Sequence, residues 1–225
     1  MPEPYQVYNT EEMEDYNILT YTTIPFEDRV LYRRMPLNVT ETVWKEFGGM
    51  FDNETDVRKH LAGDLDEEWK VHLDESSMRQ EIKQFFCDSF SHIFRSKVIG
   101  FEFQRFITNR PFVWINRMKA NEYNPIHRHS GLFSFVWYLD IPEEIREEHK
   151  HQNSNGYNRG LITFVNKPTN NIYCNPRTSD VFIFASNHLH QVFPFKSDVE
   201  RISLAGNIDK VKFEDGSVME AKNDT

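Results

Sequence analysis

The stretch NPIHRHSGLFSFVWYLDIP, residues 124–142, combines a pair of histidines with a strand-like run. His127 and His129 stand one residue apart, directly before apolar and aromatic residues that alternate as in a β-strand. In an extended chain, residues i and i+2 point to the same face, so both imidazoles can bind one metal ion. The alternative to metal binding is that they are ordinary polar residues at a strand end.

Strand-like runs dominate the chain from residue 97 onward. They are rich in β-branched and aromatic residues, and clusters of Pro, Asn, Gly and Ser separate them. Asp215-Gly216 near the end suits the tight turn of a hairpin over residues 209–220. The pattern predicts a β-barrel or β-sandwich. The runs are VIGFEFQRFI (98–107), FVWINRMKA (112–120), GLFSFVWYLDI (131–141), GLITFVN (160–166), DVFIFAS (180–186), HQVFPF (190–195) and ERISLAGNI (200–208).

The first part of the chain has a different character. Apolar residues at helical spacing predict a helix over residues 78–94, with Ser77 and Gln80 as a capping box. Further helices are expected at 42–51 and 66–73, after extended segments near 17–33. We therefore expect residues 1–96 to form an extended and helical support region of the same domain as a β-rich core over 97–225.

Composition and charge narrow the class of protein. A chain of 225 residues fits one domain, and its net charge of −9 without a basic run disfavours nucleic acid as a partner. There is no apolar run of about 18 residues and no signal-like segment, so we expect a cytoplasmic protein that enters no membrane. Cys87 and Cys174 are too few for a disulfide framework and are expected to be reduced core thiols. No feature of the sequence indicates an oligomeric state.

One segment is polar throughout. The stretch PEEIREEHKHQNSNGYNRG, residues 142–160, has low hydrophobicity and predicts a long loop that can serve as a lid. Together with the helical region it would shape the entrance to a site.

A second pair of histidines, His188 and His190, follows another apolar run, and an antiparallel barrel can bring it close to the first pair. Farther on, Arg201 and Ser203 share one face of a predicted strand. A guanidinium can hold a carboxylate through two parallel hydrogen bonds, and the hydroxyl can add a third. These residues suggest a dicarboxylate co-substrate near a metal. The alternative is an Arg201 on the outer edge of a barrel, paired with a neighbouring acid.

The order of these motifs resembles a known family. His127-x-His129, then WYLDIP, GLITF, VFIFASNHLHQVFP and RISLAGN together look like the Fe(II)- and 2-oxoglutarate-dependent oxygenases, over roughly residues 112–208. Several separated motifs in one order are more specific than any single one. The resemblance implies a double-stranded β-helix, a jelly-roll barrel with helical support, and a metal in its mouth.

The resemblance also implies roles for individual residues. His127 and His190 would be metal ligands, Arg201 and Ser203 would bind the far carboxylate of 2-oxoglutarate, and Tyr138 would donate a hydrogen bond to it. For Tyr138, packing of its ring in the core is an equally good interpretation. Asn116, Tyr123 and Asn124 lie upstream of the metal strand and would line the mouth for substrate, unless they serve turns and strand edges.

One position departs from the family pattern. Most members have Asp or Glu two residues after the first histidine, where this chain has His129. A third imidazole keeps the facial arrangement of ligands and removes one negative charge. His129 is therefore the expected third ligand, and His188 is its competitor, because it can share the strand face of His190.

Three functions remain open from the sequence. The first is a hydroxylating dioxygenase that uses Fe(II), 2-oxoglutarate and dioxygen and releases succinate and carbon dioxide, as the resemblance implies. The second is a three-histidine metal dioxygenase without 2-oxoglutarate, which would be favoured if Arg201 were buried against an internal acid. The third is a non-catalytic barrel used for binding or assembly. The substrate, small-molecule or peptidyl, is not encoded in any motif.

Overall fold

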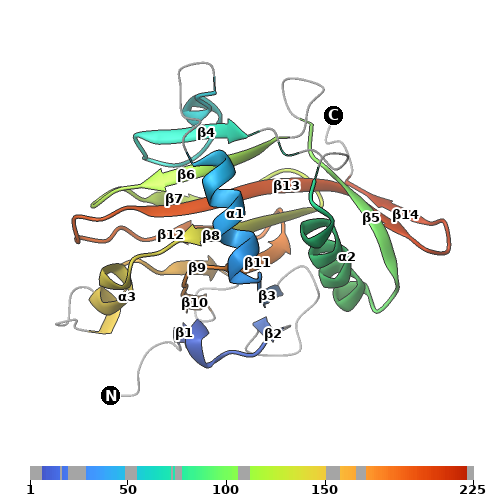
Figure 1. The fold of residues 1–225 in the computed structure, drawn as a ribbon, viewed down its shortest axis with the longest axis horizontal. Coiled ribbons are helices and arrows are strands. Elements are labelled where there is room, and N and C mark those ends of the chain that lie inside the picture. Colours follow the sequence, from blue (N-terminus) through green and yellow to red (C-terminus); the bar gives the residue numbers. More distant parts are fainter. Residues whose placement is uncertain are drawn as a thin grey trace.

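Two β-sheets and three helices make up the described part of the chain (Figure 1). The computed structural model describes residues 7–15, 17–19, 29–48, 55–71, 73, 78–105, 112–150, 158–165 and 171–221. The five-stranded sheet has the order β1 (Val7–Asn9), β10 (Asn171–Asn175), β9 (Ile162–Val165), β12 (His190–Val192) and β7 (Asn124–His127).

The larger sheet has nine strands. Its order is β2 (Asn17–Leu19), β3 (Val30–Arg34), β11 (Asp180–Ala185), β8 (Phe133–Asp140), β13 (Arg201–Phe213), β6 (Val113–Met118) and β4 (Glu67–Val71), and β5 (Val98–Phe103) and β14 (Val218–Glu220) also pair with β13. The helices are α1 (Leu37–Phe47), α2 (Gln80–Phe94) and α3 (Glu143–Lys150), with short 3-10 helices at Thr10–Glu12 and Arg58–His60.

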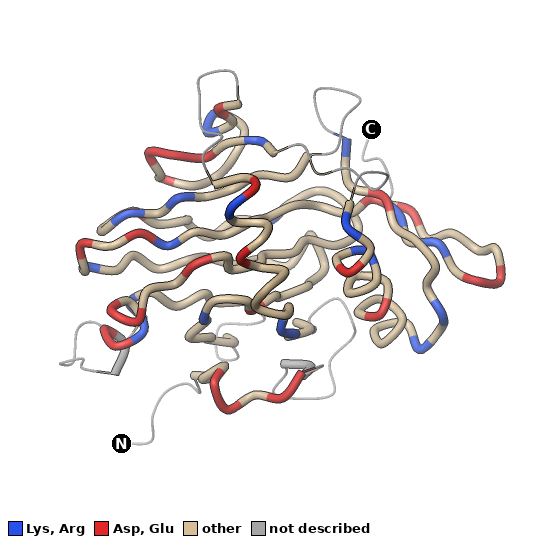
Figure 2. Tube along the Cα trace, viewed as in Figure 1, with Lys and Arg blue, Asp and Glu red and all other residues tan. Residues whose placement is uncertain are grey.

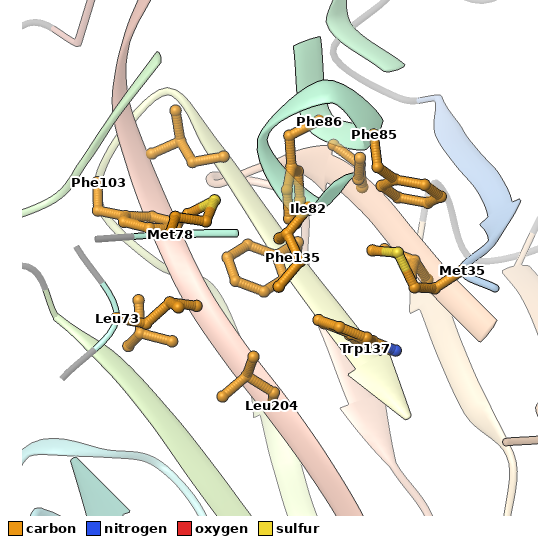
Figure 3. Packing of buried hydrophobic residues seen from close by; sticks show 14 of the residues in the cluster. Met35, Leu73, Met78, Ile82, Phe85, Phe86, Phe103, Phe135, Trp137 and Leu204 are labelled. Atoms are coloured by element: carbon orange, nitrogen blue, oxygen red, sulfur yellow. The ribbon is translucent and has the colours of Figure 1, made fainter. Parts of the chain in front are cut away.

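Alternation along the strands of the larger sheet divides the apolar residues into two layers. On β8, Trp137 belongs to the cluster that also contains the buried face of α2, whereas its neighbour Tyr138 belongs to the cluster shared with the smaller sheet. In the outer layer, Ile82 and Phe86 of α2 pack toward the sheet (Figure 3). The inner layer joins the two sheets, so the fold is a sandwich of sheets with α1 and α2 on one outer face.

Strands from the first part of the chain extend both sheets. β1 pairs in parallel with β10, β3 pairs with β11, and β4 pairs with β6. The support region is thus built into the sheets of the core, while a single domain over 1–225 stays a prediction.

Most of the predicted elements are confirmed. Each of the seven strand-like runs contains a strand, and the final hairpin turns at Gly216, whose φ of +86° suits glycine. The helix predicted over 78–94 is present as α2, but it begins at Gln80 with Arg79 at the N-cap, so Ser77 is not its cap. Ser77 lies outside the described residues. Cys87 and Cys174 are free and buried.

Three local predictions are wrong in the type or the bounds of the element. The helix expected at 66–73 is strand β4, because its backbone pairs with β6, a partner distant in sequence. The helix expected at 42–51 begins earlier, at Leu37 after Pro36, and ends before Gly48. The first half of the expected loop at 142–160 is helix α3; residues 151–157 lie outside the described part. Among the described residues, no helix is both long enough and apolar enough to cross a membrane.

Candidate metal centre

Three histidines meet at the edge of the smaller sheet. His127 ends β7 and His190 begins β12, and the two residues are direct partners across these antiparallel strands. His129 follows two residues later. One ring nitrogen from each of the three lies within 4.8 Å of those from the other two, and no carboxylate joins this group within the described part of the chain. The arrangement can hold one metal ion through three imidazoles.

The turn after β7, not a shared strand face, brings His129 to the other two. The prediction that His127 and His129 begin one strand is therefore wrong, because β8 begins only at Phe133. The His129 backbone N–H donates to the Ser186 carbonyl oxygen at 2.8 Å, which fixes this turn against the chain after β11. Gly131, with a φ of +103°, completes the turn in a conformation that disfavours a side chain.

Backbone carbonyl groups orient two of the three rings. Nδ1 of His127 lies 2.7 Å from the Pro125 carbonyl oxygen, and Nδ1 of His190 lies 3.0 Å from that of His188. With Nδ1–H donating to a carbonyl oxygen, Nε2 of each ring is left as an unprotonated metal ligand. This pattern is typical of metal-binding histidines.

Burial keeps the three imidazoles neutral. Desolvation lowers the pKa of His127 and lowers that of His190 well below the usual value. It also lowers the pKa of His129 to about 3, and the neighbouring His127 adds to the effect. Neutral imidazole is the form that binds a metal ion, so the cluster is in its ligand state near pH 7.

His188 does not join the cluster. Its side chain is buried and its ring lies 5.8 Å from the ring of Phe164, centroid to centroid. Its backbone carbonyl instead accepts the hydrogen bond from His190. The geometry therefore favours His129 over His188 as the third ligand.

Arg201 is a buried cation for which the described part of the chain provides no acidic partner. It is 2% exposed, and its guanidinium donates to the Gly160 carbonyl oxygen at 2.8 Å and contacts the Met118 sulfur. No carboxylate within the described ranges lies within ion-pair distance of it, and burial lowers its pKa. Glu200 pairs with Arg117 instead. Since buried charges are normally paired, Arg201 marks a place for an anion.

Tyr138 and Ser203 lie beside Arg201. The Arg201 guanidinium carbon lies 5.9 Å from the centre of the Tyr138 ring, and the Tyr138 hydroxyl is buried with no hydrogen-bond partner among the described residues. Ser203 is directly opposite Tyr138 across β13 and β8 and accepts a 3.3 Å hydrogen bond from Asn116. The group offers one charged donor and two hydroxyls to a carboxylate.

A single pocket between the sheets contains both groups. The three histidines, Arg201, Ser203 and Tyr138 all line it, as do Asn116 and Asn124. Tyr123, by contrast, is 40% exposed and pairs with Asp64 through a backbone bridge. Of the three upstream residues expected at the mouth, the structure thus brings two to the pocket.

Among the pocket residues that the sequence did not indicate is one charged side chain, Glu68 on β4. It is 1% exposed, and its Oε2 has no hydrogen-bond partner within the described segments. The segment was expected to be helical, and a charged residue gives no sign of burial in the sequence. Only the pairing of β4 with β6 turns Glu68 into the pocket.

Comparison with known proteins supports the resemblance. Residues 112–207, less than half of the chain, match the family model described as "Putative 2OG-Fe(II) oxygenase". No curated protein matches the chain. A crystal structure of a Pseudomonas putida prolyl-4-hydroxylase is similar with a TM-score of 0.51 at 12% identity, over 80% of this chain and 91% of that one.

A second similar structure is a prolyl hydroxylase from Trichoplax adhaerens in complex with a hypoxia inducible factor peptide fragment. Its TM-score is 0.48 at 10% identity, over 83% of this chain and 84% of that one. The family match and the fold confirm the resemblance to 2-oxoglutarate-dependent Fe(II) oxygenases and the jelly-roll fold class. They support an oxygenase of this kind.

Proposed function

We propose that this protein is an Fe(II)- and 2-oxoglutarate-dependent dioxygenase that hydroxylates a small-molecule or peptidyl substrate. The observation that carries the proposal is the presence of two groups in one pocket: a cluster of three neutral histidines, and a buried arginine that has no acidic partner among the described residues. Either group alone has ordinary explanations, whereas their combination matches the needs of a metal-chelating dicarboxylate.

The residues present fit both the metal and the co-substrate. Nε2 of His127 and of His190 and a ring nitrogen of His129 would hold Fe(II). Arg201 would bind the far carboxylate of 2-oxoglutarate, and the Tyr138 hydroxyl, which has no partner in the described segments, would donate a hydrogen bond to it. When bound, Fe(II), 2-oxoglutarate and dioxygen supply the oxidation that hydroxylates the substrate and releases succinate and carbon dioxide.

The chain itself would orient the reactants and exclude water. The Pro125 and His188 carbonyl groups keep the ligand rings in one tautomer. The ring of Phe184, whose centroid lies 4.7 Å from that of His190, forms an apolar wall beside the metal ligands. Such walls limit access of bulk water and strengthen the electrostatic contacts inside.

The third histidine of the cluster, His129, is also compatible with a second function. A three-histidine dioxygenase that does not use 2-oxoglutarate is favoured by the absence of a carboxylate from the cluster within the described residues. The environment of Arg201 argues for the first function, because no internal acid neutralises it there.

Anaerobic titration of metal-free protein with Fe(II) and then 2-oxoglutarate tests the proposal. We expect a visible charge-transfer band of the chelate, abolished in His190→Ala and weakened in Arg201→Ala. Iron binding without a band would favour the three-histidine dioxygenase. Failure to bind iron would refute both enzymes and leave the non-catalytic barrel.

A further inference from the structure

Glu68 and Asn116 form a second polar group in the pocket, separate from the residues assigned to metal and co-substrate carboxylate. The two residues are direct partners across β4 and β6, and Asn116 is in turn opposite Ser203 on β13. Because partners across a sheet point to the same face, both side chains reach the inner face that lines the pocket.

Each of the two side chains has a buried oxygen to which no described residue donates a hydrogen bond. Glu68 is 1% exposed and Asn116 is 7% exposed, and neither Glu68 Oε2 nor Asn116 Oδ1 accepts a hydrogen bond from the described residues. The Asn116 amide nitrogen is already used, since it donates to Ser203. Buried acceptors are rarely left unsatisfied, so two of them in one pocket indicate a ligand with N–H or O–H donors.

The charges around Glu68 favour a cationic ligand. Asp56 and Glu122 add negative potential at Glu68, and the nearby cation Arg58 is bound through two nitrogens to Asp56. Lys119 forms its ion pair with Glu67, the residue before Glu68 in the chain. This ion pair does not neutralise Glu68. Figure 2 shows a run of acidic residues at the start of β4. A positive group entering the pocket would thus meet an uncompensated carboxyl group.

The aromatic lining fits the same ligand. Trp114, two residues before Asn116 on β6 and therefore on the same face, also lines the pocket and is 3% exposed. An indole face attracts ammonium and guanidinium groups, especially where water is excluded.

We propose that the substrate carries an ammonium or guanidinium group, and that Glu68 and Asn116 bind this group beside Trp114. The inference rests on the proposed function, because it assigns the substrate side of the same pocket. It defines the substrate class as a basic small molecule or a basic side chain of a peptide.

Calorimetric titration of the full chain in the presence of a chelator tests the proposal without requiring iron or 2-oxoglutarate. The probes are n-butylammonium and n-butylguanidinium chlorides, with butyramide as a neutral donor of similar size. We expect at least one cation to bind at least about tenfold more tightly than butyramide. Equal affinity for butyramide, or no saturable binding of either cation, would overturn the proposal.

Glu68→Gln removes the charge while preserving shape and should weaken binding of the cation at least about tenfold. Glu46→Gln on the exposed face of α1 removes the same charge away from the pocket and should leave affinity unchanged. Unchanged affinity in Glu68→Gln would overturn the proposal. A missing chelate band with intact cation binding would instead refute the proposed function alone.

A measurement on the unmodified chain covers the case in which Glu68→Gln does not fold. Burial, with Asp56 and Glu122, raises the pKa of Glu68 to about 8, and Arg58 opposes this shift. Cation binding at pH 7 should therefore release a proton from Glu68. Comparing heats in buffers of different ionisation enthalpy measures this release, and cation binding without it would contradict the role of Glu68.

Discussion

Replacing Glu68 by glutamine should remove a pH-dependent loss of stability from the protein. Burial is the main cause that raises the pKa of Glu68, from a usual 4.5 to about 8. The folded state then binds this proton more tightly than the unfolded state does. Stability must fall as pH rises through the window between the two values, because the unfolded chain ionises freely and the folded chain does not.

The size of the effect follows from the two pKa values. A difference of 8 − 4.5 = 3.5 units corresponds to a limit of about 5 kcal/mol at high pH. The loss between pH 5 and pH 7 should be roughly 2.5 kcal/mol, with roughly 1.4 kcal/mol more by pH 9. Glu68→Gln does not titrate, so its stability relative to the unmodified protein should rise by these amounts.

Urea denaturation of metal-free protein at pH 5, 7 and 9 measures the effect. Taking the difference between Glu68→Gln and the unmodified protein at each pH cancels the titration of all other groups. Glu46→Gln serves as the control for removal of an exposed charge, and its difference should stay flat. Parallel profiles for Glu68→Gln and the unmodified protein would refute the reasoning, because they would mean that Glu68 ionises normally in the folded state.

Three further outcomes are expected. Arg201→Lys should weaken 2-oxoglutarate binding by about tenfold or more without changing Fe(II) affinity, since it keeps the charge and loses the planar fork; unchanged co-substrate affinity in calorimetry would count against the assignment. Phe86→Ala should lower the free energy of unfolding by about 3–5 kcal/mol in urea, because Phe86 is 1% exposed and packs against Phe135; a loss under about 1 kcal/mol would contradict this packing. Gly131→Ala should destabilise the turn that carries His129, by about 1 kcal/mol or more, and weaken Fe(II) binding; an unchanged protein would show that the positive φ is not required there.

The sequence predicted the β-rich core well because alternation of apolar residues is a local signal. Strand β5 is an example, since the buried Phe101 and Phe103 stand on either side of the half-buried Glu102 in its sequence. Strand β4 was missed because Leu65, Trp69 and Leu73 have helical spacing, and only the distant partner β6 makes the segment extended. Helix α3 was missed because its segment is short and very polar, as loops usually are.

The site was predictable in its residues and less so in its geometry. The spacing of His127 and His129 indicated that both bind the same metal ion. The turn that brings their rings together, however, depends on a backbone hydrogen bond from His129 to Ser186, which is far away in the chain. The choice between His129 and His188 as the third ligand needed the folded turn, which brings His129 and not His188 to the other two rings. Glu68 could not be found at all, because nothing in a run of acidic residues tells which of them is buried.

Iron-edge anomalous diffraction from crystals prepared anaerobically with Fe(II) and 2-oxoglutarate tests the central claim most directly. We expect one iron peak among the rings of His127, His129 and His190, with a carboxylate of the co-substrate on Arg201. Iron at this position with Arg201 still facing an empty space would contradict the use of 2-oxoglutarate. An iron peak elsewhere, or none, would contradict the metal centre itself.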